Sequence, residues 1–208
     1  MSYFTRATLR FLTELEEHNE RPWFEANKAR YQADVKEPAD HLLRDAGAAL
    51  GMAGRVMRIH RDVRFSKDKS PYKTNLGIVL QPSGAPKGTL VGGVYLHVTP
   101  RENFIACGLW HPSAPQLAAV RDAIVADPTA WKRARKVGLD EDDEALQRAP
   151  RGFDPDHPLI DDLRRKNFTS SLELTPAQMC GDDLLERVVA AEKKLRPLNA
   201  FLLKALSA

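Results

Sequence analysis

The sequence has few cysteines and no long apolar run. Only two cysteines, Cys107 and Cys180, occur in its 208 residues, too few for a disulfide framework or a thiolate zinc site. Cys107 lies in an apolar stretch, where we expect a buried, inert thiol. No segment approaches the roughly 18 apolar residues of a membrane span, and the N-terminus resembles neither a signal nor a transit peptide. These absences favour a cytoplasmic protein that does not cross a membrane.

The motifs of several common enzyme classes are also missing. The chain has no glycine-rich phosphate loop, no dinucleotide-binding fingerprint and no serine-nucleophile elbow. Its six histidines include no pair with the helical spacing of metal ligands. We therefore expect no metal site, and the sequence specifies no cofactor. Hydrophobic residues make up 43% and charged residues 28%, as in ordinary globular proteins, and without a Pro/Ser-rich linker we expect one compact domain over residues 1–208.

Hydrophobic periodicity predicts an α+β fold. The N-terminal segments 5–18, 21 onward and 38–51 have helical spacing, with Thr5 as a capping residue. Capping boxes at Ser113 and Thr175 predict later helices, the last of them interrupted near Pro197. Short runs rich in Val, Ile and Leu predict the strands Arg55–Arg61, Leu76–Gln81, Val91–Thr99, Asn103–Leu109 and Phe168–Leu174. We expect an antiparallel sheet of about four to five strands, packed against the N- and C-terminal helices.

Positive charge is concentrated in one segment. The whole chain has a net charge of +3, whereas residues 55–73 alone have +5 and the rest of the chain −2. The segment contains two acids and seven basic residues, which are Arg55, Arg58, Arg61, Arg64, Lys67, Lys69 and Lys73. Its cations cannot all pair with its own carboxylates, so the surplus must face water, pair with distant acids or meet an anionic ligand.

The string from Arg61 to Lys73 connects two predicted strands and carries the candidate site. Arginine offers a planar fork for phosphate or carboxylate, and lysine adds point charge. The candidate ligand-binding residues here are Arg61, Arg64, Ser66, Lys67, Lys69, Tyr72 and Lys73. The candidates for proton transfer are His60, Asp62, Asp68 and Tyr72, and we prefer for both acids the role of holding a neighbouring arginine. Phe65 and Pro71-Tyr72 would anchor the loop; the alternative is a solvated surface loop that binds nothing.

This string resembles the R-D-x-R-F-S-x-D-K-x-P-Y-K signature of a bacterial and fungal family of uncharacterised proteins, catalogued as a domain of unknown function. The resemblance covers nearly the whole chain. It extends to Trp23-Phe24, Asn27-Lys28 and Tyr31, to Gly108-Leu109-Trp110 with Pro112, and to Arg151-Gly152-Phe153, His157-Pro158 and Lys166. Arg151 stands where lysine is commoner in the family, so the positive charge is kept. The resemblance supports a site and implies no reaction.

Three functions remain open. We expect Arg21, Lys28, Arg151 and Lys166 to converge with the loop cations on one cleft that binds a phosphorylated or carboxylated small molecule, with or without enzymatic activity. A nucleic-acid-binding module, with Tyr72 or Phe65 stacking on a base, ranks second because the basic density is confined to one segment. In the third, the cations form internal ion pairs that hold the fold. Substrate, reaction and oligomeric state are not specified by the sequence.

Overall fold

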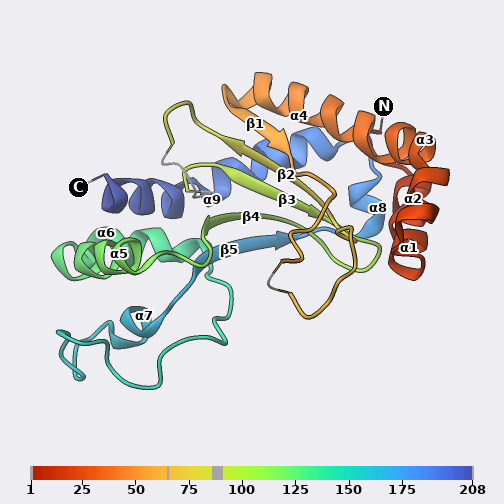
Figure 1. The fold of residues 1–208 in the computed structure, drawn as a ribbon. Helices are drawn as coiled ribbons and strands as arrows, with labels where there is room; N and C mark the ends of the chain where they lie inside the picture. Colours follow the sequence, from red (N-terminus) through yellow and green to blue (C-terminus); the bar gives the residue numbers. More distant parts are fainter. Residues whose placement is uncertain (1, 65, 86–90, 208) are drawn as a thin grey trace. The chain divides into compact units, whose positions relative to one another are not determined.

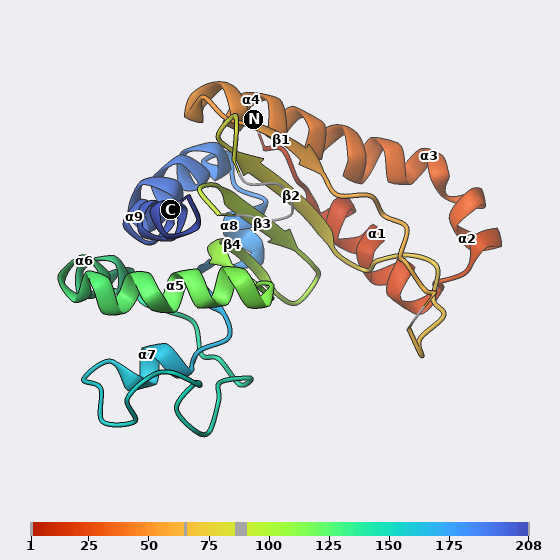
Figure 2. The same cartoon turned by 60° about the vertical axis from the view of Figure 1, so that its left-hand side comes forward.

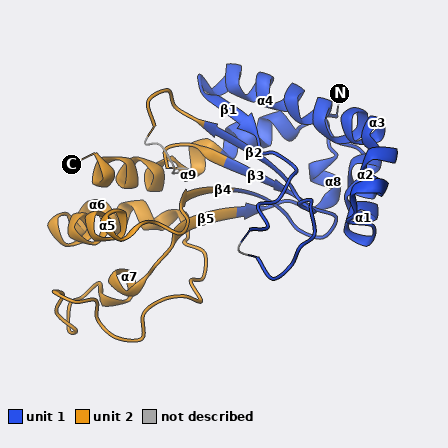
Figure 3. Cartoon of the chain, viewed as in Figure 1, with its two compact units in different colours: residues 1–80, 95–105, 172–191 blue, residues 81–94, 106–171, 192–208 orange. Residues whose placement is uncertain are grey.

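The computed structural model describes residues 2–64, 66–85 and 91–207. Its contacts group into two compact units, each built from three separate stretches of the chain (Figure 3). Unit 1 comprises residues 1–80, 95–105 and 172–191, and unit 2 comprises residues 81–94, 106–171 and 192–208. The single-domain organisation expected from the sequence stays a prediction.

One five-stranded antiparallel sheet joins the strands in sequence order, β1-β2-β3-β4-β5 (Figure 1). This order is typical of a meander, in which each strand pairs with the next along the chain. The α+β class with an antiparallel sheet is therefore confirmed. The strands are β1 (Ala53–Val56), β2 (Leu76–Gln81), β3 (Val94–Val98), β4 (Asn103–Leu109) and β5 (Phe168–Glu173).

Unit 1 contains the N-terminal helices. Thr5 caps the first of these helices through a capping box. The apolar stripe of this helix buries Phe11, Leu12 and Leu15. The last N-terminal helix ends at Gly51, whose φ of +64° suits a left-handed helix cap, and it lies beside β1 (Figures 1 and 2). The helices are α1 (Arg6–Glu17), α2 (Arg21–Ala26), α3 (Lys28–Tyr31), a π-helical turn (Gln32–Lys36), α4 (Glu37–Leu50) and α8 (Pro176–Met179).

Unit 2 has its own aromatic core. Trp131 is fully buried, with its ring centroid 5.7 Å from that of Phe168 and 5.1 Å from that of Phe201. Burial raises the pKa of the Cys107 thiol to about 12, in keeping with the inert thiol expected from the sequence. The helical elements are α5 (Ala114–Ala126), α6 (Pro128–Ala134), a 3-10 turn (Arg135–Val137) and α7 (Ile160–Arg164), while α9 (Leu184–Leu206) has residues in both units.

Three predicted boundaries were wrong for local reasons. The strand predicted as Arg55–Arg61 is β1, Ala53–Val56, and after one further hydrogen bond from Met57 to Gly77 of β2 the chain turns away, because residues 59–61 pair with residues 71–73 of the returning chain. The strand predicted from Val91 begins at Val94, after a turn at Gly92 with φ +86°. The last helix continues through Pro197 without a break, because the buried leucines on either side keep it packed.

Among the described residues, no helix combines the length and the apolarity that a membrane span requires.

Candidate functional site

The candidate site lies in the connection between β1 and β2, residues 57–75, which we call the basic loop. Its two limbs pair with each other: the Arg61 amide donates to the Pro71 carbonyl at 2.9 Å, and the Lys73 amide to the Ile59 carbonyl at 2.7 Å. The Asn19 side chain, just after α1, bonds to both the amide and the carbonyl of Tyr72, at 3.0 and 2.9 Å. The loop is therefore held at its base in one conformation. Phe65, proposed from the sequence as an anchor or stacking group, lies outside the described residues.

Tyr72 anchors the loop through its ring. The residue is 3% exposed, and its ring stacks on Phe24 with centroids 4.1 Å apart and an interplanar angle of 21°. The His60 ring lies 5.3 Å from Tyr72, and His60 itself is exposed. The Tyr72 ring thus belongs to the aromatic core of unit 1 and has no open face for a nucleic-acid base.

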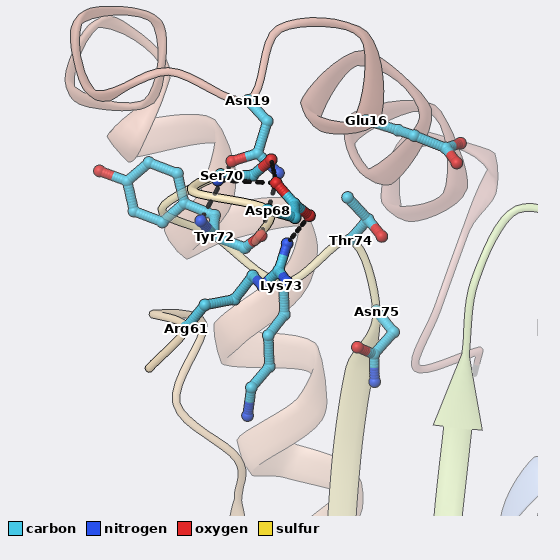
Figure 4. A pocket seen from close by; sticks show the side chains of 9 residues that line it. All are labelled: Glu16, Asn19, Arg61, Asp68, Ser70, Tyr72, Lys73, Thr74 and Asn75. Atoms are coloured by element: carbon cyan, nitrogen blue, oxygen red, sulfur yellow. Dashed lines mark hydrogen bonds and ion pairs between the residues drawn. The ribbon is translucent and has the colours of Figure 1, made fainter. Parts of the chain in front are cut away.

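Both acids of the loop hold arginines. Asp62 accepts two hydrogen bonds from the Arg64 guanidinium, at 2.9 and 2.7 Å, and these bonds lower the pKa of the Asp62 carboxyl. Asp68 accepts from the Ser70 hydroxyl, the Ser70 amide and the Arg61 guanidinium, which together hold the pKa of Asp68 far below its usual range (Figure 4). These are the positioning roles preferred from the sequence for Asp62 and Asp68.

A pocket of about 390 Å³ opens between the end of α1 and the basic loop. Its two acids are already paired, Asp68 with Arg61 and Glu16 with Arg101, the latter at 2.8 Å. Most of the remaining wall consists of neutral hydrogen-bonding groups. The lining residues are Glu16, Asn19, Arg61, Asp68, Ser70, Tyr72, Lys73, Thr74 and Asn75 (Figure 4).

Of the two cations that line this pocket, Arg61 is paired with Asp68, whereas the Lys73 ammonium has no ion-pair partner among the described residues. Its side chain is half-buried and extends away from Asp68 and Glu16 (Figure 4). In the part of the chain that the structure describes, no carboxylate lies within ion-pair distance of Lys73 or of Arg58. Burial lowers the pKa of the Lys73 ammonium, and the nearby Arg58 charge lowers it further. Two like charges therefore lie near each other, and neither is in ion-pair contact with a carboxylate of the described residues, although the Arg58 charge also lowers the pKa of Asp62.

The model of a family of conserved hypothetical proteins, DUF2461, matches residues 7–201. The chain belongs to this family. No curated protein and no solved structure matches the chain significantly. Membership of DUF2461 agrees with the resemblance found in the sequence but brings no activity with it, so the function has to be argued from the site.

The other cations predicted for the site lie in several places. In unit 1 of this DUF2461 chain, Arg21 is exposed at the start of α2, and Lys28 pairs with Glu25 at 3.4 Å. Arg151 is exposed and Lys166 half-buried, and both belong to unit 2. Their predicted convergence with the basic loop stays a prediction.

Three further loop residues complete the predicted set. The Lys69 ammonium donates to the Val63 carbonyl at 3.0 Å, so it ties the loop to itself. Lys67 is exposed and Ser66 half-buried. A ligand-binding role for these residues also stays a prediction.

Sequence reasoning missed the neutral half of the pocket. Asn19 and Asn75 come from segments outside the charged string, and an isolated asparagine gives no signal of binding. The sequence places Arg58 in the charged segment and in a predicted strand, and neither feature indicates that its charge acts on Lys73. In the described residues no group of three or more His, Cys, Asp or Glu is arranged to hold a metal ion.

Proposed function

We propose that the pocket of the basic loop binds a small anionic molecule through a phosphate or carboxylate group. The proposal rests on one observation: Lys73 is half-buried at the pocket wall beside Arg58, and neither has a carboxylate partner among the described residues. Arg58 is exposed, whereas Lys73 is partly withdrawn from water near that like charge, which is unfavourable unless an opposite charge compensates it. An anion beside Lys73 would offset the repulsion by Arg58 and raise the pKa of the ammonium.

The neutral groups of the pocket suit the same ligand. The Thr74 hydroxyl and the Asn75 amide can donate to anion oxygens that Lys73 does not reach. The paired acids Glu16 and Asp68 are engaged by arginines, which limits their repulsion of an anion. A volume of about 390 Å³ lies within the usual range for pockets that enclose small molecules.

The same geometry favours this function over the two alternatives. Arg61 and Arg64 are engaged by loop carboxylates, and the buried Tyr72 ring is not open to a base; Phe65, the other stacking group of the nucleic-acid hypothesis, lies outside the described residues. These pairs support a structural role for Arg61 and Arg64. A structural role does not account for the half-buried Lys73.

Thermal shift with a panel of probes tests the proposal. The panel contains inorganic phosphate, a phosphorylated sugar, a small hydroxycarboxylate and a single-stranded oligonucleotide. A small anion is expected to raise the melting temperature of the wild type, because a ligand that binds only the native state stabilises it by mass action. Titration calorimetry of Lys73→Met should then show a loss of affinity of about tenfold or more, since hydrogen bonds to charged groups contribute strongly.

Lys194→Met is the matched control, because it removes the same charge from an exposed position on α9. It should bind as the wild type does. Equal binding by Lys73→Met, or no response to any small anion, would refute the proposal. Binding of the oligonucleotide alone, weakening steeply with salt, would establish the nucleic-acid function in its place.

A further inference from the structure

The wall of the pocket in the basic loop is polar throughout. Each of the described lining residues has a side chain that can form hydrogen bonds, and none of them has a purely apolar side chain. The one aromatic ring among them, that of Tyr72, stacks on Phe24 in the core of unit 1. An apolar ligand would displace water from these groups without replacing its hydrogen bonds. The pocket therefore suits a ligand that forms hydrogen bonds along its length.

The lining residues leave a single charge to compensate. Arg61 pairs with Asp68, and Glu16 pairs with Arg101 at 2.8 Å, so neither pair has a net charge. Lys73 is the lining cation for which the described residues provide no ion-pair partner. One acidic group on a ligand compensates Lys73, and a second would meet no further unpaired cation among the described lining residues. This count favours a ligand whose remaining groups are uncharged.

The wall also offers hydrogen-bond acceptors, which an ionised acid cannot use. Asp68 accepts from the Ser70 hydroxyl, the Ser70 amide and the Arg61 guanidinium, so about one of the roughly four lone-pair positions of its carboxylate stays open. The Asn75 side-chain oxygen and the Thr74 hydroxyl have no hydrogen-bond partner among the described residues. An ionised carboxylate only accepts hydrogen bonds. By itself it would displace water from these acceptors and leave them unsatisfied, which is unfavourable.

Arg61 and Lys73 face the pocket from the same side of the paired limbs of the loop. His60 and Tyr72 form an antiparallel bridge, and side chains alternate in direction along each limb. Residues 61 and 73 therefore point to the face opposite to that of the bridged pair, as diagonal neighbours with Cβ atoms about 7–8 Å apart, within reach of long side chains. Both line the pocket (Figure 4). Asp68 binds Arg61 through Nη1 alone, so Nε and Nη2 have no partner among the described residues.

We infer that the ligand of this pocket is a polyhydroxylated acid, such as a sugar acid or a sugar phosphate. The inference rests on the proposed function and narrows the ligand class. The acidic group binds Lys73, and the hydroxyls bind the open donors of Arg61 and the open acceptor of Asp68. A hydroxyl donates and accepts at the same oxygen, so it complements a wall that carries both kinds of group. An amine would also donate to the acceptors, but its positive charge would be repelled by Lys73.

Two pairs of probes that differ only in their hydroxyls test the inference. Gluconate and hexanoate have the same chain length and charge, and so do glycerol phosphate and propyl phosphate. In titration calorimetry the wild type is expected to bind the hydroxylated member of at least one pair about 10- to 100-fold more tightly, the contribution of two or three neutral hydrogen bonds. Glucose, which has hydroxyls but no acidic group, should bind at least about tenfold more weakly than gluconate.

Asp68→Asn tests the part of the preference that depends on an acceptor. The change replaces one acceptor oxygen by a donor and frees the charge of Arg61, which favours both members of a pair alike. The ratio of their affinities should therefore fall by about 3- to 10-fold, the contribution of one hydrogen bond. Asp62→Asn is the matched control, because Asp62 holds Arg64 in the same loop but does not line the pocket. It should leave the ratio unchanged.

The outcomes separate the two claims. If no small anion binds, or if glucose binds as tightly as gluconate, the proposed function fails and the inference fails with it. If hexanoate and propyl phosphate bind as tightly as their hydroxylated partners, and Lys73→Met weakens that binding, the proposed function stands and the inference is wrong. The wild-type comparison decides this even if Asp68→Asn does not fold.

Discussion

Replacing Lys73 with methionine is expected to stabilise the unliganded protein while it weakens the anion binding that we propose. Methionine keeps the length and the apolar part of the side chain, so the half-buried position stays filled. The change removes a cation whose pKa is lowered first by burial and then by Arg58. A group whose charged form is disfavoured by folding lowers the free energy of unfolding while it stays charged.

The magnitude follows from partial burial. Because Lys73 retains contact with water, the gain is that of an optimised surface charge, about 0.5–1 kcal/mol, or roughly 1–4 °C in melting temperature for a chain of this size. The lowered pKa of Lys73 also determines how the stability gained in Lys73→Met changes with pH. The penalty is fully present below the lowered pKa of Lys73 and disappears as the pH rises toward 10.5, the usual value. The gain from Lys73→Met should therefore be largest at neutral pH and shrink in alkaline buffer.

Urea unfolding at pH 7 and pH 10.5 measures this effect, with Lys194→Met as the control. A double-mutant cycle with Arg58→Gln isolates the repulsion. Each single change relieves it, so the double variant should gain less than the sum of the two. A loss of stability in Lys73→Met of more than about 1 kcal/mol, which is typical of a disrupted ion pair, would show that the protein already compensates this charge.

Three further changes test other parts of the structure. Gly108→Ala should lower the free energy of unfolding by at least about 2 kcal/mol, because φ is +115° and the new Cβ would lie 2.1 Å from a β5 carbonyl oxygen. Gly152 also has a positive φ, +90°, but has open space around it. Gly152→Ala should therefore lose less free energy of unfolding in the same urea titration. Asn199→Ala should lose about 1–3 kcal/mol by the same measurement, because the buried amide donates to the Gly93 carbonyl at 2.7 Å. The lowered pKa of Asp68 stabilises the protein above pH 3.8, the usual value, and this stabilisation is lost as the pH falls through the pKa of the folded state. Asp68→Asn should therefore flatten the decline of stability in acid. An unchanged acid profile would contradict this.

The fold was largely predictable because its strands obey local rules. The strands β2 and β4 have the bounds that the sequence indicated, since each is an apolar run closed by turn residues. The wrong strand and helix boundaries arose where contacts with residues far away in the sequence determine the local structure. Asn199 holds Gly92 and Gly93 in a turn through two hydrogen bonds, and no local pattern at residue 91 reveals this contact.

The site was predictable only in its charges. The pairing of Asp62 with Arg64 follows from neighbours in the sequence, and the surplus of cations pointed to residues 61–73. The stacking of Tyr72 on Phe24 joins residues far apart in the chain, so a residue proposed as a ligand contact is part of the core. The sequence predicts His97 to be an ordinary hydrogen-bonded strand residue, and the structure places it on β3. Its contact with Asn75 depends on the pairing of strands in the sheet, which the local sequence does not specify.

The interleaving of the two units bears on how the protein is made. Unit 1 is complete only when residues 172–191 have been synthesised, and unit 2 only with residues 192–208. Domains that are continuous in sequence fold one after another as they leave the ribosome, but here unit 1 still lacks residues 172–191 when most of unit 2 has already emerged. Removing residues 172–208 would therefore take material from both units, and a nascent chain that stops before β5 leaves β4 as an exposed edge of the sheet.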